Sequence, residues 1–159
     1  MRKSVKLLLG LSFLISASVY AQDIPTTQEF HPRTAVEGTK GSSQFFTGDV
    51  RVQEMTRTND TTNYGTGYVT FSPGARSAWH THPAGQTLVV ISGTCWTQVW
   101  NGEKTVAQAG DVIWCPTGVK HWHGATPDGE MTHFTITGMK DGKNVEWLEK
   151  VTDEQYLGK

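Results

Sequence analysis

The segment that decides the fold is GARSAWHTHPAGQ, residues 74–86. It carries two histidines, His80 and His82, at positions i and i+2, and side chains with this spacing in a β-strand point to the same face. Both imidazoles can therefore face one interior point. The Pro83-Ala84-Gly85 turn lets the next strand run back beside the first, so Gln86 can face the same point.

A second histidine pair, His121 and His123, has the same spacing and also follows a glycine-containing turn. A lone pair of this kind is more often a polar or surface feature than a metal site. Here two pairs come from different parts of the chain and can meet around one ion. Three imidazoles and one amide oxygen bind a first-row divalent ion and leave positions open for a substrate. The expected metal ligands are His80, His82, Gln86 and His121.

From Phe45 onward, short β-rich runs alternate with turn signals, which is typical of a sandwich or a closed barrel. The Asn101-Gly102 dipeptide predicts a type I′ hairpin turn. The sequence predicts strands at 50–55, 68–71, 87–91, 95–100, 105–109, 112–114, 121–123 and 131–137.

Both ends of the chain differ from this pattern. A short basic start, an apolar run over residues 7–15 and a small residue, Ala21, predict a secretory signal peptide over residues 1–21. The apolar run is short for a bilayer span, and a retained anchor is the alternative. We expect export to a bacterial periplasm, with no membrane contact after cleavage. Residues 22–43 read as a linker or N-terminal arm, and residues 44–159 as the folded domain.

The C-terminal segment predicts helical structure. Trp147, Leu148 and Val151 have the spacing of a short helix that packs one face on the barrel. Thr152 and Gln155 have capping-box spacing, so a further helical turn can begin there.

Composition narrows the classes of partner. The chain has 14 Lys+Arg and 15 Asp+Glu, with no basic stripe, which argues against nucleic acid. Its two cysteines, Cys95 and Cys115, fit two interpretations equally well. Export permits a disulfide, whereas the apolar runs around both residues suit buried free thiols.

Two glycine-to-histidine patterns together resemble the paired motifs of the cupin superfamily. The first is Gly74-x5-His80-x-His82-x3-Gln86-x6-Gly93, and the second is Gly110-x5-Pro116-x-Gly118-x2-His121. The resemblance implies an all-β cupin jelly-roll barrel with a short C-terminal helix. Gln86 stands where the usual ligand is a glutamate. Because three histidines and one glutamine are all neutral ligands, a bound divalent ion keeps its full double charge. This strengthens the ion as a Lewis acid and favours redox-neutral chemistry over oxygen activation.

Four stretches are similar to a narrower group, the manganese-dependent bacterial cupin hydroxynitrile lyases, which cleave or form cyanohydrins. These stretches are 75–83, 121–125, 131–133 and 151–156. The resemblance implies the same four metal ligands, with Mn²⁺ as the expected ion and Fe²⁺, Zn²⁺ or Ni²⁺ as alternatives. It also places His123 and His133 in the pocket, with Ser77 where a Thr is common and Thr137 where the lyases have a Gln.

Residue chemistry is compatible with these roles. Cyanohydrin cleavage needs a base for the hydroxyl proton, and His123 shares the strand face of His121 without being needed as a ligand. We therefore assign catalytic roles to His123, His133 and Ser77. Thr135 and Thr137 alternate with His133, so we expect them to line the substrate pocket. The alternatives are a hydrogen-bonded wall residue for His133 and a solvent-facing or supporting residue for His123.

Three functions remain open at this point. The first is a redox-neutral lyase acting on a small carbonyl or cyanohydrin-type substrate. The second is a metal-dependent oxidoreductase such as a dioxygenase, and the third is a non-catalytic cupin that binds a metal or a small molecule. Gln86 favours the first over the second, and the surplus of cavity-directed histidines favours an enzyme.

Two tryptophans, Trp79 and Trp122, alternate with the ligand histidines and therefore point out of the cavity. Large aromatic side chains on an outer face commonly cover a partner, so we expect a homo-oligomer with this face or the N-terminal arm in the contact. The alternative is that both tryptophans pack under the C-terminal helix.

Overall fold

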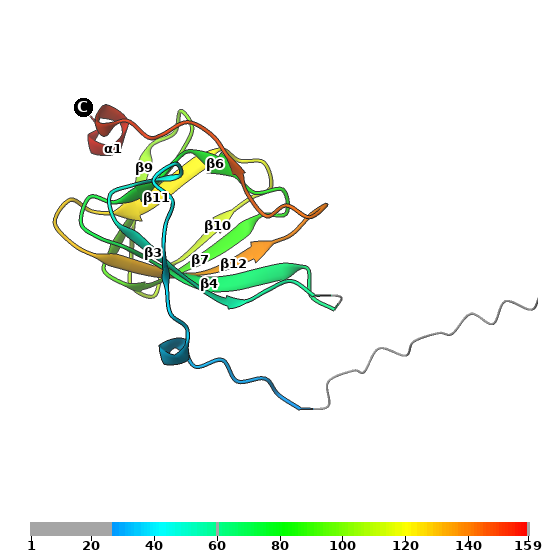
Figure 1. The fold of residues 1–159 in the computed structure, drawn as a ribbon. Coiled ribbons are helices and arrows are strands. Elements are labelled where there is room, and N and C mark those ends of the chain that lie inside the picture. Colours follow the sequence, from blue (N-terminus) through cyan, green and yellow to red (C-terminus); the bar gives the residue numbers. More distant parts are fainter. Residues whose placement is uncertain (1–26, 60, 159) are drawn as a thin grey trace, which may run out of the picture. The chain divides into compact units, whose positions relative to one another are not determined.

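The computed structural model describes residues 27–59 and 61–158. The chain divides into two units, residues 1–30 and 31–159, and the helices and strands lie in the second unit (Figure 1). The predicted signal peptide lies outside the described residues. Within the described part of the chain, no helix is long and apolar enough to cross a membrane.

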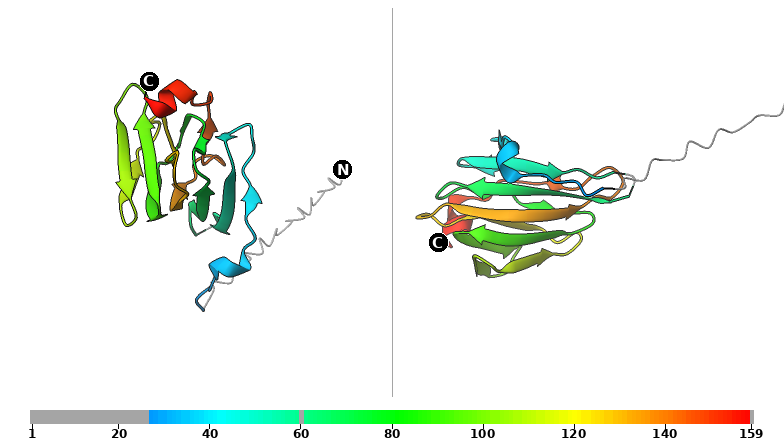
Figure 2. Two further views of the ribbon diagram at one scale, coloured as in Figure 1. Left: turned by 90° about the vertical axis from the view of Figure 1, so that its left-hand side faces the viewer. Right: turned by 90° about the horizontal axis from the view of Figure 1, so that it is seen from below.

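The second unit is built from two antiparallel β-sheets that face each other (Figures 1 and 2). The first sheet has the order β1 (Thr39–Lys40), β3 (Val50–Thr56), β4 (Tyr64–Phe71), β12 (Met131–Gly138), β7 (Gln86–Ser92) and β10 (Val112–Cys115). The second has the order β13 (Glu146–Trp147), β6 (His80–Thr81), β11 (His121–Ala125), β5 (Arg76–Ser77) and β2 (Phe46–Thr47), and β8 (Thr94–Val99) joins β11 to β9 (Lys104–Gln108). This arrangement confirms the predicted all-β jelly-roll barrel.

Each strand predicted from the sequence is present, and the largest difference is at β4, which begins at Tyr64 rather than at residue 68. Two glycines, Gly65 and Gly67, make this part of the strand hard to recognise. Gly67 is needed because a Cβ atom there would lie 2.8 Å from the Gln53 carbonyl oxygen on β3. The predicted type I′ turn is wrong, because Asn101 has a positive φ of 61° but Gly102 does not.

The prediction of a helix around residues 147–151 is also wrong, because this segment runs beside β6 and pairs with it. Trp147 lies in β13 and pairs with His80, and the Leu148 N–H donates to the Trp79 carbonyl oxygen at 2.8 Å. These bonds satisfy backbone groups that β6 would otherwise leave unpaired. The C-terminal helix is α1 (Asp153–Leu157), which begins with a complete capping box formed by Thr152 and Gln155, as predicted.

Trp79 and Trp122 are covered within the chain. Their exposed fractions are 2% and 0%, and they pack with Val151 and Tyr156 of the C-terminal segment. The Tyr156 hydroxyl donates to the Ala125 carbonyl oxygen at 2.7 Å, which fastens this cluster to β11. Packing under the C-terminal segment is therefore the correct interpretation, and these two side chains are not exposed to form an oligomer contact.

The main core lies between the sheets. It includes Phe71, Val90, Met131 and Cys95, all of which are buried. Cys95 and Cys115 are both free thiols. Of the two interpretations that the sequence left open, a disulfide and buried free thiols, the structure agrees with the second. Burial raises the pKa of each thiol to about 12.

Residues 33–41 of the N-terminal arm lie along the first sheet. Its strand β1 pairs with β3, and the Gly41 N–H donates to the Val50 carbonyl oxygen at 2.8 Å. Earlier in the arm, a short 3₁₀ helix (Arg33–Ala35) places the Arg33 guanidinium 4.4 Å from the centre of the Tyr68 ring. Residues 33–41 of the arm thus belong to the compact unit that begins at His31.

We predict that Tyr156→Phe lowers the free energy of unfolding by about 1–2 kcal/mol, because it removes one buried hydroxyl bond and leaves the Ala125 carbonyl oxygen unpaired. Tyr64→Phe is the matched control, since Tyr64 is 43% exposed. Urea unfolding of both variants measures the difference. Equal stability of the two would show that the hydroxyl does not fasten the C-terminal segment.

Candidate metal centre

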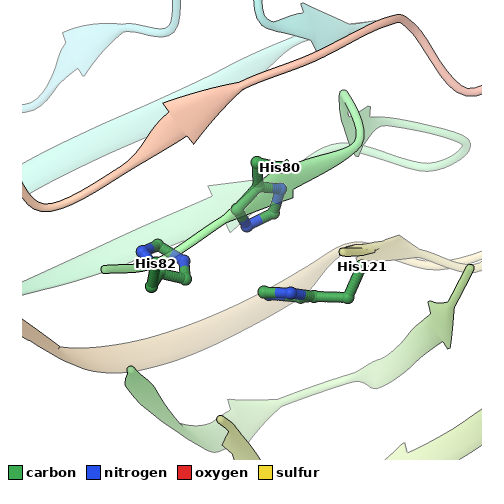
Figure 3. Close-up of side chains that lie close together, drawn as sticks. All are labelled: His80, His82 and His121. Atoms are coloured by element: carbon green, nitrogen blue, oxygen red, sulfur yellow. The ribbon is translucent and has the colours of Figure 1, made fainter. Parts of the chain in front are cut away.

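Three buried histidines converge on one point (Figure 3). His80 comes from β6, His82 follows that strand, and His121 begins β11, where it pairs directly with His80. One ring nitrogen from each lies within 4.8 Å of the other two, close enough for one ion to contact all three. The antiparallel pairing of β6 with β11 therefore brings together ligands that are about 40 residues apart in the sequence.

Each of the three imidazoles is oriented by a backbone carbonyl. The Nδ1 atoms of His80, His82 and His121 lie 2.9, 2.6 and 2.8 Å from the carbonyl oxygens of Ala78, Asn144 and Val119, respectively. Because a carbonyl oxygen can only accept, each Nδ1 carries the proton and each Nε2 keeps its lone pair. This is the tautomer that a metal-binding histidine needs.

Gln86 supplies a fourth donor atom. Its amide nitrogen donates to the Thr137 hydroxyl at 3.0 Å, which fixes the amide with Oε1 on the other side. The Oε1 atom is buried and has no hydrogen-bond partner within the described residues, and the same is true of His82 Nε2 and His121 Nε2.

The donor set fits a divalent ion. Buried acceptors without a partner each cost about 1–3 kcal/mol, so several together at one point indicate that something else satisfies them. Nitrogen donors with one amide oxygen suit a first-row metal ion. A group of three histidines that could hold a metal is thus present. The buried Gln86 Oε1 has no hydrogen-bond partner in the described part of the chain, and its assignment as a fourth ligand stays a prediction.

The histidines are neutral at physiological pH. Burial, followed by the charges of His121 and His82, lowers the pKa of His80 well below its usual value. Burial lowers the pKa of His121 to about 4. Neutral imidazoles keep the lone pairs that bind a metal.

A second pair of histidines lies beside the first group. The ring centres of His123 and His80 are 5.1 Å apart, and His133 Nε2 lies 3.3 Å from His123 Nδ1. The Phe71 ring contacts the rings of His123 and His133, and the distances between ring centres are 5.7 and 5.6 Å, respectively. Burial lowers the pKa of His133 to about 3 and that of His123 well below its usual value.

Ser77 occupies a supporting position. Its hydroxyl oxygen accepts from the His123 backbone N–H at 3.1 Å, which ties β5 to β11 next to the histidine pair. The Ser77 hydroxyl is therefore already hydrogen-bonded to the backbone. Its distance from a reacting group depends on the position of the bound substrate.

A cavity of about 430 Å³ is lined by Thr137, the residue that accepts from the Gln86 amide. Thr135 and Thr137 line it, and their hydroxyl oxygens are 2.8 Å apart. Asn144, whose carbonyl oxygen orients His82, also lines it. The rest of its wall includes Gly67 and Val69 of β4, the arm residues Val36, Glu37 and Thr39, and the charged pair Glu54 and Arg57.

Sequence reasoning missed the groups that orient the ligands. The carbonyl oxygens of Ala78, Val119 and Asn144 act through the backbone, so residue type carries no signal for them. It also missed Trp147, whose ring lies 5.0 Å from that of His80 and stacks on Phe45 at 4.8 Å. Only the pairing of β13 with β6 reveals that position.

We predict that protein purified without a histidine tag contains about one divalent ion per chain, and that His80→Ala and Gln86→Ala lose it because each removes a donor atom. His31→Ala is the control, because His31 is exposed. Elemental analysis measures the content. A wild-type protein that holds no manganese, iron, nickel or zinc, even after incubation with each, would contradict the assignment.

We predict that Thr137→Val weakens metal binding by about 10-fold or more, because the Gln86 amide loses the acceptor that keeps its oxygen facing the histidines. Thr137→Ser should restore the affinity, since it returns the hydroxyl. Competition with a chelating dye measures both affinities. If valine and serine bind the metal equally well, the hydroxyl does not position Gln86.

Comparisons with known proteins identify the family of the chain. The family model for the cupin domain matches residues 67–137. The (R)-mandelonitrile lyase of Granulicella tundricola is 50% identical over 117 residues, which are 74% of this chain and 89% of that protein. The crystal structure of a cupin-like protein from Thermotoga maritima is 39% identical, with a TM-score of 0.72, covering 82% of this chain and 96% of the other.

A more distant structure shows how widely the fold is shared. A predicted oxalate decarboxylase from Thermotoga maritima has a TM-score of 0.64 at 15% identity, over 70% of this chain and all of the other. It supports the fold alone. With its paired motifs, its jelly-roll sheets and a 50% identical lyase relative, the chain belongs to the cupin family, within the hydroxynitrile lyase-like group.

Proposed function

We propose that the protein is a metal-dependent lyase that cleaves or forms a cyanohydrin-type compound, using one divalent ion held by His80, His82, Gln86 and His121. Manganese is the first candidate metal. The observation that carries the proposal is the hydrogen-bonded pair of His123 and His133 directly beside the three-histidine group. The relative named as a mandelonitrile lyase supports the same reaction class.

The bound ion would supply a fixed positive charge that stabilises the leaving cyanide. In the cleavage direction, the hydroxyl proton passes to His123, the hydroxyl oxygen forms a carbonyl group, and the carbon–cyanide bond breaks with its electron pair going to cyanide. Cyanide then takes up the proton and leaves as hydrogen cyanide. No electron is gained or lost overall, so the reaction needs no redox partner.

His133 assists by fixing the tautomer of His123. If the His123 Nδ1–H donates to His133 Nε2, the other ring nitrogen of His123 keeps its lone pair and can accept a proton. Ser77 holds the backbone of His123 in place. The two histidines therefore act as one unit, and each loses much of its effect without the other.

The cavity of about 430 Å³ is the proposed substrate site, because it reaches Thr137, which contacts the ligand Gln86. Its size is within the range of small-molecule sites. The Thr135 and Thr137 hydroxyls can hydrogen-bond a carbonyl or hydroxyl oxygen. The arm residues in its wall give the segment before β2 a role in substrate selection.

We also propose that the chain is exported, on the strength of the basic start and apolar run in residues 1–21. A cyanohydrin lyase in the envelope would act on compounds that arrive from outside the cell. Detoxification or scavenging is consistent with such a location.

We predict that manganese-loaded protein releases benzaldehyde and cyanide from mandelonitrile. His123→Ala and His133→Ala should each lower kcat/KM by about 10²-fold or more while keeping the metal, because they remove the base or its orienting partner. His31→Ala is the control. Absorbance of the released aldehyde gives the rate, and elemental analysis verifies the metal.

Two outcomes would contradict the proposal. Oxygen consumption during turnover, recorded with an oxygen electrode, would indicate the oxidoreductase alternative instead. Tight binding of small carbonyl compounds with no turnover on any cyanohydrin would indicate a binding protein.

A further inference from the structure

The interior face of the first sheet places Gln86 between two different neighbours. Thr137 on β12 and Cys115 on β10 are both paired with it, one on each side. Directly paired residues on antiparallel strands point to the same face, so all three side chains face the interior. The cavity described above lies on the Thr137 side, and the Cys115 side leads to a separate space.

That space is a second cavity of about 160 Å³ between β10 and the β8–β9 hairpin. It reaches the metal centre, because His121 forms part of its wall. The larger and the smaller cavity have no lining residue in common. The wall includes Thr97, Val99, Thr105, Ile113 and Cys115, of which Val99 and Thr105 are exposed at the open end.

The gap has a structural cause. The strand β10 is the last strand of one sheet and β9 is the last strand of the other, so no backbone ladder joins the two sheets at this edge. The register also places the wall against the histidines, since Val99 pairs with His121 and Thr97 with His123. The opening therefore leads inward along the strand that carries these two histidines.

One side of the opening adjoins the turn before Gln86. Trp114, on the rim, packs against Gly85, where a Cβ atom would lie 2.3 Å from the tryptophan ring. Gly85 has a positive φ of 77°, a backbone conformation that favours glycine. Because Gln86 directly follows this turn, the rim and the ligand share one support.

We propose that the second cavity is a separate site and passage for a small neutral molecule, hydrogen cyanide, on the His121 side of the metal centre. This inference rests on the proposed lyase function. The organic carbonyl compound would occupy the larger cavity. The two products of cleavage would then leave by different routes, and cyanide can depart while the carbonyl product is still bound.

Size and charge favour this occupant. A volume of about 160 Å³ corresponds to roughly five water molecules at about 30 Å³ each, which suits a molecule of two or three heavy atoms together with water. The interior wall offers aliphatic groups, threonine hydroxyls and one thiol. Glu103 is the one charged acid or base among the wall residues, and its negative charge at the rim disfavours anions.

The test narrows each cavity in turn. Thr105→Phe narrows the smaller cavity, because Thr105 lies on its wall opposite Thr97. Val106→Phe is the matched control on the same strand, since Val106 is 53% exposed and is not part of the wall. Val52→Phe narrows the larger cavity instead, because Val52 lines it and pairs with Val69 on the interior face. If Thr105→Phe fails to fold, Val119→Phe narrows the same opening from the other side.

The primary readout is binding rather than turnover. Cobalt-loaded protein is mixed with cyanide at neutral pH, where the probe is mainly hydrogen cyanide, and the change in the visible spectrum of the cobalt gives the association rate. We expect Thr105→Phe to slow association about tenfold, with no change in Val106→Phe or Val52→Phe. In cyanohydrin synthesis, Thr105→Phe should raise KM for cyanide alone, and Val52→Phe should raise KM for the aldehyde alone.

Equal association rates in Thr105→Phe and wild type, or slower association in Val52→Phe, would overturn the inference. The two proposals fail separately. If association slows only in Thr105→Phe but no cyanohydrin is turned over, the passage is supported and the lyase function is contradicted. If the enzyme turns over mandelonitrile but Thr105→Phe binds and uses cyanide normally, the lyase function is supported and the passage is contradicted.

Discussion

The metal centre depends on three imidazole N–H groups that donate to backbone carbonyl oxygens. These bonds decide which nitrogen of His80, His82 and His121 keeps its lone pair, and they hold the rings where one ion can contact all three. A histidine side chain that rotates freely loses conformational entropy when it binds a metal. These rings are already ordered before the metal binds, so that entropic cost is smaller. The carbonyl partners are fixed by the strands and turns around them. Any disturbance of those strands therefore reaches the metal through the backbone, with no change in the ligands themselves.

The C-terminal segment belongs to this framework. Asn144, which orients His82, lies just before β13, and β13 pairs with the strand that carries His80. Beyond it, Tyr156 fastens the segment to the end of β11, the strand that begins with His121. Docking of residues 144–156 and assembly of the metal site therefore favour each other, because both order the same two strands. Linkage of this kind makes metal binding a contribution to the stability of the fold.

Much of this structure could be predicted because its signals are local. Histidines at i and i+2 identify a strand face, and turn residues mark the strand ends, so the three-histidine group and eight strands follow from the sequence alone. The failures have one cause in common. Trp147 has helical spacing with its neighbours, but the unpaired edge of β6 provides a partner that local spacing does not reveal. The outward-facing Trp79 and Trp122 look like an exposed surface until the C-terminal segment is in place. The amino-acid type at a position does not reveal which backbone carbonyl orients a ligand or where a cavity forms.

The neutral ligand set gives the centre an unusual charge balance. Arg76 is the only Asp, Glu, Lys or Arg side chain among the buried residues that the structure describes, so no buried carboxylate lies near the histidines to offset a divalent ion. A glutamate in place of Gln86 would supply that offset, but it would have no N–H to donate to Thr137. With glutamine, the ligand set would leave the full charge of a divalent ion unbalanced by the protein. In the proposed reaction, such an ion would stabilise negative charge on a departing group more than it stabilises a neutral substrate, which is the kind of difference that lowers a barrier. Gln86 would thus weaken the electrostatic hold on the metal and strengthen the effect of the metal on the proposed reaction.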